Sequence, residues 1–315
     1  MNYPKVEPFM DLSVIIPAFN EEDYVGQCLS SVKEVLAERD IVYEILLLDN
    51  GSCDRTSQIA SSFSGTSVFN ISRTSVSQAR NFGAQKAKGR VFAFIDADVV
   101  LKNVWGESIE TLCKSGKRLF VTGYQYGVRD EPSWIEKYWF SNLKSNHISG
   151  GNLIVGREAF FKIGGFDPGL KTGEDVDFCN RAKNNPQINF ELNPKLKSVH
   201  LGYPKNIKNF MKREYWHGEG DFRSFQSFCK SKIALVAIGY GLAHLIMLGL
   251  LIRGEYAEFL VLVILFILFN IVISSVRFKK SPKIAIFYNS ILNYFYFMAR
   301  FFSLFKAVKN RAKNY

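Results

Sequence analysis

The sequence predicts an α/β fold, with a mostly parallel sheet and flanking helices, followed by transmembrane or interfacial helices at the C-terminal end. Two observations support this prediction. Strand and helix patterns alternate from Leu12 to Ile95, which is typical of a parallel sheet with crossover helices. Long apolar segments then occupy most of the chain after Cys229, and lysines and arginines flank them.

The alternating part contains four predicted strands and three predicted helices. The strands are short, largely aliphatic runs at Leu12–Pro17, Tyr43–Leu48, Ser67–Ile71 and Val91–Ile95. The predicted helices cover Glu22–Leu36, Arg55–Phe63 and Ser75–Ala87, the last with Ser75 as its expected N-cap. Ligands of such sheets bind beyond the carboxyl ends of the strands, where Asp49, Asp96 and Asp98 fall.

After a fifth predicted strand at Leu119–Tyr124 the pattern becomes irregular. The remaining predicted elements are strands at Ser149–Gly156, Asn189–Leu192 and Leu196–His200 and helices at Arg157–Ile163 and Glu174–Lys183. We expect this half to cover the mouth of the sheet. Residues 1–205 are therefore expected to form one domain.

The net charge of +11 is distributed unevenly along the chain. Residues 229–315 contain 12 Lys and Arg against 2 Asp and Glu, which leaves a charge of only +1 for the rest. Basic segments can bind nucleic acid, but here the basic residues flank apolar runs, as in membrane segments with cytoplasmic anchors. The composition therefore predicts membrane lipids, and no nucleic acid, as partners.

Three segments make up the predicted membrane part. Residues 206–232 are expected to form an amphipathic juxtamembrane helix, and 233–276 a two-helix transmembrane hairpin. Residues 277–315 are expected to form a basic interfacial helix and tail, because a third crossing would place the cluster Lys306–Lys313 outside. A polar stripe of this helix is expected to face lipid headgroups or the α/β domain, and it includes Asn289, Asn293 and Arg300.

The cysteines and the N-terminus predict the compartment. The five cysteines are odd in number and widely spaced, so we expect them to be reduced and buried. The first residues do not resemble a signal peptide, because their apolar stretch is short and contains Pro17. We therefore expect a multi-pass protein of the cell (inner) membrane whose α/β domain is cytoplasmic.

Asp96 and Asp98 directly follow a predicted buried strand, with only Ala97 between them. Each ionised carboxylate makes ionisation of the other more costly, and burial increases that cost. A bound Mg²⁺ or Mn²⁺ ion would offset it, with phosphate and water filling the remaining coordination positions. Asp-x-Asp alone is common in turns, and its place at a strand end favours the metal.

Five other residues have a structural and a functional interpretation. Asp49 could close an Asx-turn or accept a hydrogen bond from a base or ribose. Arg80 could form an exposed salt bridge or contact a phosphate or base. Glu174 and Asp175 could stabilise a helix dipole, although one of the carboxylates would also suit a general base. His200 could be a packed side chain or a metal ligand.

Six motifs in one order resemble those of family-2 glycosyltransferases with the GT-A fold. They are VIIPAFNEE, LLLDNGSCDRT, ARNFG, FIDAD, GGNLIVGREAFFKIGGFD and GEDVDFCNR. The resemblance covers about Leu12 to His200, and six ordered motifs are far more specific than one. It implies a GT-A type, Rossmann-like catalytic domain and a metal-dependent transferase of the hexosyltransferase type that uses a nucleotide-sugar.

The resemblance also implies a role for each candidate residue. Asp175 would be the catalytic base, with Glu174 on the acceptor side. Asp96 and Asp98 would bind the metal, with His200 as a further ligand. The donor-binding residues would be Pro17, Phe19, Glu21, Asp49, Arg80, Asp96, Gly151 and Asn152. The base would deprotonate the acceptor hydroxyl opposite the leaving nucleoside diphosphate, so the product would have inverted configuration.

One departure from the family narrows the prediction. Processive relatives carry a Gln/Arg-x-x-Arg-Trp motif and more membrane helices, whereas this chain has Arg213–Gly218 (REYWHG) in the comparable region. A processive synthase is therefore not expected, although Trp216 could still stack on an acceptor. Because the anchor places the site beside the bilayer, we expect a lipid-linked or glycan acceptor at the cytoplasmic leaflet.

Two rival functions remain at this point. A sugar nucleotidyltransferase would need a basic phosphate-binding loop near the first strand, whereas Pro17–Glu22 is acidic. An inactive membrane scaffold with the same fold would be expected to have lost Asp96, Asp98 or Asp175, and all three are present.

Overall fold

The structure is a computed structural model that describes residues 10–143, 147–170, 172–222, 225–279 and 281–312. The chain forms two compact units. The first, called the sheet unit here, comprises 1–129 and 145–202; the second, called the helical unit, comprises 130–144 and 203–315. Two lysines of the predicted basic anchors, Lys280 and Lys313, lie outside the described residues.

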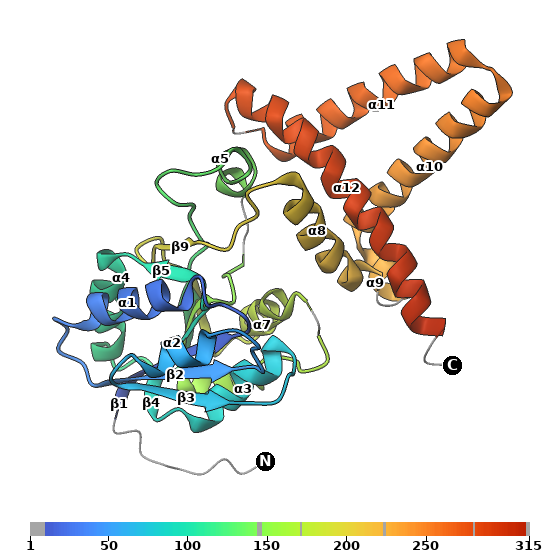
Figure 1. Ribbon diagram of the computed structural model, residues 1–315. Coiled ribbons are helices and arrows are strands. Elements are labelled where there is room, and N and C mark those ends of the chain that lie inside the picture. Colours follow the sequence, from blue (N-terminus) through green and yellow to red (C-terminus); the bar gives the residue numbers. More distant parts are fainter. Residues whose placement is uncertain (1–9, 144–146, 171, 223–224, 280, 313–315) are drawn as a thin grey trace. The chain divides into compact units, whose positions relative to one another are not determined.

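The sheet unit is built on a seven-stranded, mostly parallel sheet, as predicted (Figure 1). The strand order is β3-β2-β1-β4-β7-β6-β8. The strands are β1 (Met10–Ala18), β2 (Tyr43–Asp49), β3 (Thr66–Asn70), β4 (Gly89–Ile95), β6 (Phe120–Gly123), β7 (Asn152–Gly156) and β8 (Asn189–Leu192). Strands β1 to β4 are parallel to one another, whereas β7 is antiparallel to both of its neighbours.

A second, two-stranded sheet pairs β5 (Val99–Leu101) antiparallel with β9 (Ser198–His200). Val99 is the register partner of His200. This pairing brings the end of β9 beside the segment that follows β4, although about half the length of the sheet unit separates them in sequence.

Helices cover both faces of the large sheet. On one face lie α1 (Val25–Leu36), α2 (Thr56–Ser61) and α4 (Asn103–Lys114), and on the other α3 (Val76–Lys86), α6 (Arg157–Ile163) and α7 (Glu174–Lys183). The apolar spacing predicted for α1 is its buried face, with Val25, Leu29 and Val32 fully covered. Each such side chain contributes about 1.5–3 kcal/mol when buried.

Helix α3 begins as predicted. Ser75 caps it by accepting a hydrogen bond from Gln78 N, and Gln78 completes a capping box. A Cβ at Gly83 would lie 2.5 Å from Ile15 Cγ2, so only glycine allows α3 to approach β1 this closely. This approach fixes the position of Arg80, which lies one turn earlier on the same helix.

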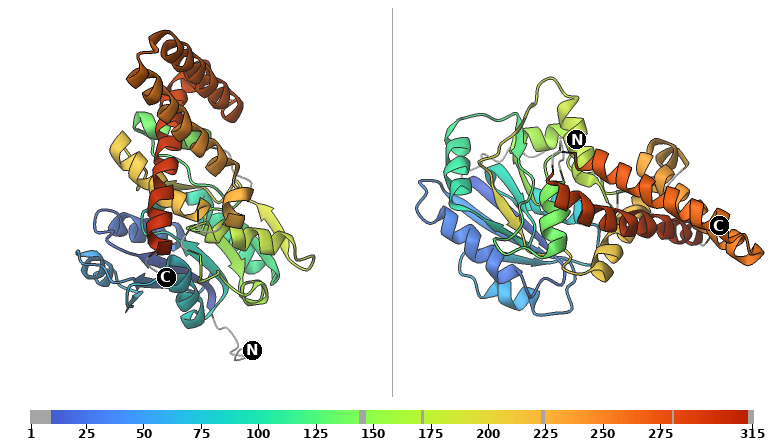
Figure 2. Two further views of the ribbon diagram at one scale, coloured as in Figure 1. Left: turned by 90° about the vertical axis from the view of Figure 1, so that its right-hand side faces the viewer. Right: turned by 90° about the horizontal axis from the view of Figure 1, so that it is seen from above.

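The helical unit contains α5 (Trp134–Tyr138), a 3₁₀ turn (Phe140–Asn142), α8 (Ile207–Asp221), α9 (Phe225–Lys230), α10 (Lys232–Arg253), α11 (Tyr256–Arg277) and α12 (Lys283–Ala312). Helices α10 and α11 meet at Gly254, whose φ of 76° suits glycine (Figure 1). Figure 2 shows this hairpin and the long α12 from two further sides. Among the described residues, α10 and α11 are the helices long and apolar enough to cross a membrane.

The polar stripe of α12 lies against other helices of the same unit. Asn293 Nδ2 donates to Asn270 Oδ1 of α11 at 3.1 Å, and Arg300 forms ion pairs with Glu214 and Asp221 of α8 at 2.9 and 2.7 Å. The expectation that this stripe faces headgroups or the α/β domain is therefore wrong. Periodicity identifies a polar face, but polar groups among apolar helices pair with one another, which periodicity does not reveal.

Candidate active site

Asp96 lies immediately after β4, and protein groups bind both of its carboxylate oxygens. Oδ1 accepts from Arg80 Nη2 at 2.7 Å and Oδ2 accepts from the Tyr126 hydroxyl at 2.8 Å. Burial alone would raise the pKa of Asp96, but the charge and hydrogen bond of Arg80 and the hydroxyl of Tyr126 lower it overall. Asp96 is therefore held as a carboxylate in a fixed orientation.

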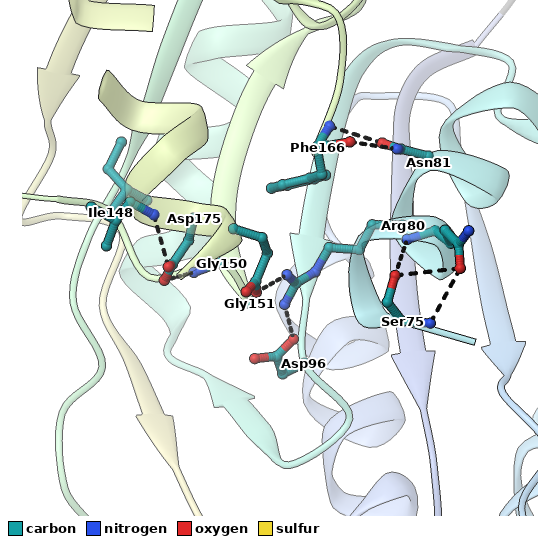
Figure 3. A network of polar contacts seen from close by, with 12 residues as sticks. Ser75, Arg80, Asn81, Asp96, Ile148, Gly150, Gly151, Phe166 and Asp175 are labelled. Carbon is teal, nitrogen blue, oxygen red and sulfur yellow. Dashed lines mark hydrogen bonds and ion pairs between the residues drawn. The ribbon is translucent and has the colours of Figure 1, made fainter. Parts of the chain in front are cut away.

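Arg80 of α3 connects Asp96 to α7. Its Nη1 donates to Glu174 Oε1 at 2.7 Å. Figure 3 shows the contact of the same guanidinium with Asp96. The side chain is 3% exposed. Of the two interpretations given from sequence, an exposed salt bridge is thus excluded, and contact with a donor stays a prediction.

Helix α7 presents three carboxylates in its first turn, after Gly173 at a φ of 76°. Asp175 Oδ2 accepts from the backbone N–H of Gly150 at 3.2 Å (Figure 3). His147 Nε2 lies 3.7 Å from the same oxygen. The predicted base is thus held by a backbone donor, with an imidazole beside it.

Asp98 and His200 lie side by side because β5 pairs with β9. His200 Nε2 is 3.3 Å from Asp98 Oδ2. A Cβ at Gly202 would overlap that oxygen, so glycine is required here for the close approach. Burial, together with Asp98 and Asp96, raises the pKa of Glu21 to about 8. The corner between β1 and β4 therefore has a strongly negative potential.

The carboxyl ends of β1 and β2 form a second group of contacts. Asp49 Oδ1 accepts from Ser52 N at 3.0 Å, three residues on, so the side chain closes the local turn, although an Asx-turn would use the N–H two residues on. The Asn50 side chain bonds the backbone of Thr74 in both directions, at 3.0 and 2.8 Å. The Arg73 guanidinium then lies 3.3 Å from the ring centroid of Phe19.

Four predicted ligand contacts remain predictions. Pro17 is buried within β1. The Asn152 side chain is fully buried, where it accepts from Trp105 Nε1 at 3.1 Å and donates to two backbone carbonyls. Gly151 contacts Asp96 so closely that a Cβ would overlap the carboxylate. Trp216 belongs to α8 of the helical unit, where its side chain is exposed.

Sequence reasoning missed Tyr126, His147 and Gly202. Tyr126 follows β6 in a stretch without a charge pattern, and His147 precedes the glycine pair by a few residues. Neither has a local signal, since both acquire their importance from contacts far away in sequence. For Gly202, the sequence signal is its position two residues after His200, which is a candidate metal ligand.

The sequence matches a protein-family model. The model of Glycosyl transferase family 2 covers residues 13–172, which is half of the chain. The chain belongs to glycosyl transferase family 2. The order of motifs that suggested this family from the sequence is thereby confirmed.

Curated glycosyltransferases are similar in sequence to part of the chain. The chain is 30% identical over 190 residues to glycosyltransferase AglE of Haloferax volcanii, a match that covers 56% of this chain and 61% of that protein. An uncharacterized glycosyltransferase of Haemophilus influenzae is 26% identical over 191 residues, with 56% and 63% covered. The matches thus span about three-fifths of the length of these relatives.

A solved structure resembles nearly the whole chain. It is the mannosyltransferase PcManGT of Pyrobaculum calidifontis, in complex with GDP-Man and Mn²⁺. The TM-score is 0.55 at 15% identity, with 95% of this chain and 88% of that chain covered. The family-2 glycosyltransferase described here has the predicted GT-A fold, followed by two apolar helices.

The side chains at this site fit a divalent cation that they would coordinate together with a bound ligand. The described residues contain no group of three or more His, Cys, Asp or Glu side chains able to hold a metal alone. The Asp98–His200 pair supplies carboxylate and imidazole ligands. The raised pKa of Glu21 reflects its burial and the negative charges of Asp98 and Asp96 beside it. A cation here would take its remaining ligands from phosphate and water, as Mg²⁺ commonly does.

Proposed function

We propose that this glycosyltransferase transfers a sugar from a nucleotide-sugar to an acceptor hydroxyl with inversion of configuration. The donor diphosphate would lie at the carboxyl ends of β1 and β4, near Asp96 and Asp98. A divalent cation bound by Asp98 and His200 would supply positive charge for the diphosphate. The mannosyltransferase of similar fold is complexed with GDP-Man and Mn²⁺, which supports a donor of this class.

One observation carries this proposal: the unbalanced negative charge beside the sheet. Burial, together with the charges of Asp98 and Asp96, raises the pKa of the half-buried Glu21 to about 8. Repulsion between these carboxylates destabilises the site unless a bound cation offsets their negative charge. An anionic diphosphate could bind only together with that cation, which matches a metal-dependent donor site.

Asp175 is the proposed general base. Its carboxylate is held by Gly150 N and lies next to His147, which fixes its orientation. It would remove the proton from the acceptor hydroxyl while that oxygen bonds to the anomeric carbon. The bond from this carbon to the phosphate oxygen breaks in the same step, and the nucleoside diphosphate leaves from the opposite face.

We further propose that α10 and α11 anchor the enzyme in a membrane with the catalytic unit in the cytoplasm. Within the most apolar stretch of α11 only 6% of the residues are buried, whereas a core helix of a soluble protein would be mostly covered. Exposed side chains such as Leu245, Leu260 and Leu268 would contact lipid. A lipid-linked or glycan acceptor at the cytoplasmic leaflet would then be the natural substrate.

Thermal shift with Mn²⁺ and a panel of nucleotide-sugars tests the donor site. At about 100 times its dissociation constant, the correct donor should stabilise the protein by about 2.7 kcal/mol. EDTA and Asp98→Asn should each abolish the shift. The matched control is Asp40→Asn, because the Asp40 carboxylate is exposed and pairs only with surface Lys114 in the described contacts. Equal stabilisation with and without EDTA would refute metal-dependent donor binding.

Cysteine labelling in intact cells tests the anchor. In a background with exposed Cys53 and Cys229 replaced by serine, Gly254→Cys should react from outside the cell. Lys283→Cys should react only once the cytoplasmic side is opened, because two crossings return the chain there. Lys313→Cys, outside the described residues, reports on α12. Labelling of position 313 from outside would establish a third crossing and defeat the hairpin proposal.

A further inference from the structure

We infer that Arg80 is a positioning residue that sets the base-carrying helix α7 at a fixed distance from the Asp96 end of β4. The inference rests on the proposed function, because it takes Asp175 as the base and Asp96 as part of the donor site. It assigns Arg80 a task distinct from direct donor contact, namely to hold two catalytic elements together.

The two ends of the guanidinium bind different elements. Nη2 donates to Asp96 Oδ1 and Nη1 donates to Glu174 Oε1, both at 2.7 Å. A planar guanidinium presents its donors in a rigid fork, which a lysine ammonium does not. The separation of the two carboxylates is therefore set by one side chain.

Glu174 transmits this constraint to Asp175 because the two residues are neighbours in the first turn of α7. Asp175 is tied back toward Asp96 by a second route. Its Oδ2 accepts from Gly150 N, and the adjacent Gly151 N donates to the Tyr126 hydroxyl at 2.7 Å. That hydroxyl in turn donates to Asp96 Oδ2.

The contacts close into a ring in which each step is a hydrogen bond or a peptide link. In order, the ring passes through Asp96, Arg80, Glu174, Asp175, Gly150, Gly151 and Tyr126. A closed ring resists displacement more than a chain of contacts, because moving any member strains contacts on both sides. Gly150 and Arg80 also lie close together, since a Cβ at Gly150 would be 2.9 Å from Arg80 Nη1.

The next residue of α3 strengthens the same attachment. Asn81 Nδ2 donates to Phe166 O at 2.7 Å, and Phe166 N donates to Asn81 Oδ1 at 2.9 Å (Figure 3). The Asn81 side chain thus binds the backbone of the loop that connects α6 to α7. Arg80 and Asn81, which are adjacent in the ARNFG motif, together tie α3 to the second half of the sheet unit.

The test separates turnover from donor affinity in the full-length enzyme. Arg80→Gln should lower kcat by about 10²-fold, the cost expected for a misplacement on the order of 1 Å at the reacting centre. Turnover is followed as nucleoside diphosphate release from a UDP-sugar or GDP-sugar. The dissociation constant of UDP or GDP with Mn²⁺ should change by less than about threefold, since the lost interaction serves the transition state.

Three companion variants keep the test decisive. Arg80→Lys keeps the charge without the fork and should recover only part of kcat. Tyr126→Phe breaks the ring on its other side without removing a charge. If Arg80→Gln does not fold, Tyr126→Phe replaces it as the test of the ring. The control Arg157→Gln removes a half-buried arginine at the opposite end of β7, where Arg157 Nη1 donates to Ala87 O. It should reduce stability while kcat stays unchanged.

Adding Glu174→Gln to Arg80→Gln should cost little more than Arg80→Gln alone, because both act through one contact. A tenfold or greater loss of UDP or GDP affinity with kcat preserved would overturn the inference and make Arg80 a donor contact. Failure of the wild-type enzyme to bind either nucleotide with Mn²⁺ would instead refute the proposed function, so the two failures are distinguishable.

Discussion

Each unit of the molecule contains a buried arginine that bridges two carboxylates. In the sheet unit Arg80 joins Asp96 and Glu174, and in the helical unit Arg300 joins Glu214 and Asp221. The distances are nearly the same, 2.7 to 2.9 Å. Pairing and burial alone therefore do not separate a functional cluster from a structural one.

The surrounding charge does separate them. Glu214 has a second cation, Arg213, at 2.6 Å, and together with Arg300 it outweighs burial and lowers the pKa of Glu214 to about 2. In the sheet unit, by contrast, burial and the charges of Asp98 and Asp96 raise the pKa of Glu21 to about 8. The helical cluster is balanced and stabilises packing, whereas the sheet cluster carries an excess charge that suits a cation and its ligand.

The largest expected effect concerns the base on the unbalanced side. Asp175→Asn should lower turnover by about 10²–10⁴-fold, the usual range for loss of a general base, with donor affinity nearly unchanged. Asp177→Asn is the matched control, because it lies in the same first turn and pairs with Arg181. Equal losses of turnover in both variants would mean that these carboxylates stabilise the helix dipole and that Asp175 does not transfer the proton.

On the balanced side the expected effect is on stability. Glu214→Gln removes the buried anion shared by Arg213 and Arg300, which are both partly buried, and should cost about 3–5 kcal/mol of unfolding free energy. Chemical unfolding in detergent measures it. Glu255→Gln, which removes an exposed partner of Arg253, should cost at most about 1 kcal/mol. A loss of donor affinity in folded Glu214→Gln protein would contradict a purely structural role.

The pH dependence of the two units should have opposite sign. The folded-state pKa of Glu21 is raised from 4.5 to about 8, so its contribution to stability is full below the unfolded pKa and is lost as pH rises through 8. In EDTA, the Tm of the wild-type sheet unit should therefore fall as pH rises from about 5 to 8. Glu21→Gln should flatten this dependence.

Glu214 provides the opposite case. Its folded-state pKa of about 2 lies below the unfolded 4.5, so its contribution is present above 4.5 and is lost as pH falls toward 2. Acid should therefore destabilise the helical unit, and Glu214→Gln should flatten this part of its pH profile. A helical unit whose stability does not fall as pH drops from 4.5 toward 2 would contradict the lowered pKa of Glu214.

The smallest expected effect tests whether the units unfold separately. Ser75 caps α3 in one unit, and Asn206 caps α8 in the other by accepting from Asn209 N at 2.9 Å. Replacing either by alanine should cost about 1 kcal/mol. Separate unfolding transitions, followed by calorimetry, should each respond to only one of the variants; a common shift would indicate one cooperative unit.

Most of the sheet unit could be predicted because its strands and helices alternate strongly. Helix α4 was missed, and its composition explains why. Gly106 interrupts its helical pattern, yet glycine is needed there because a Cβ would overlap the backbone oxygen of Val35 on α1. Tertiary packing thus overrode the local signal. The strand β5 was missed because three residues give no readable period.

The residue types of the site could be predicted, but their connections could not. Arg80 is 16 residues from Asp96 and 94 from Glu174, so no local pattern announces that one guanidinium joins both. The turn after Asp49 is local, and the structural interpretation of Asp49 predicted a side-chain bond to it, although the bond reaches Ser52 and not the residue two positions on. The polar stripe of α12 was seen correctly as a stripe, while its neighbours depended on how the helices pack.

The assignment of residues 130–144 to the helical unit affects how the enzyme could be divided for expression. The chain passes between the units three times, so a gene cut after residue 205 would separate this segment from its unit. Trp139, now 1% exposed, would lose the covering rings of Phe210, Phe278 and Tyr296. The fragment would expose a hydrophobic aromatic patch and aggregate. Replacing 130–144 by a short glycine–serine linker in the same fragment removes that surface and offers a route to a soluble catalytic domain.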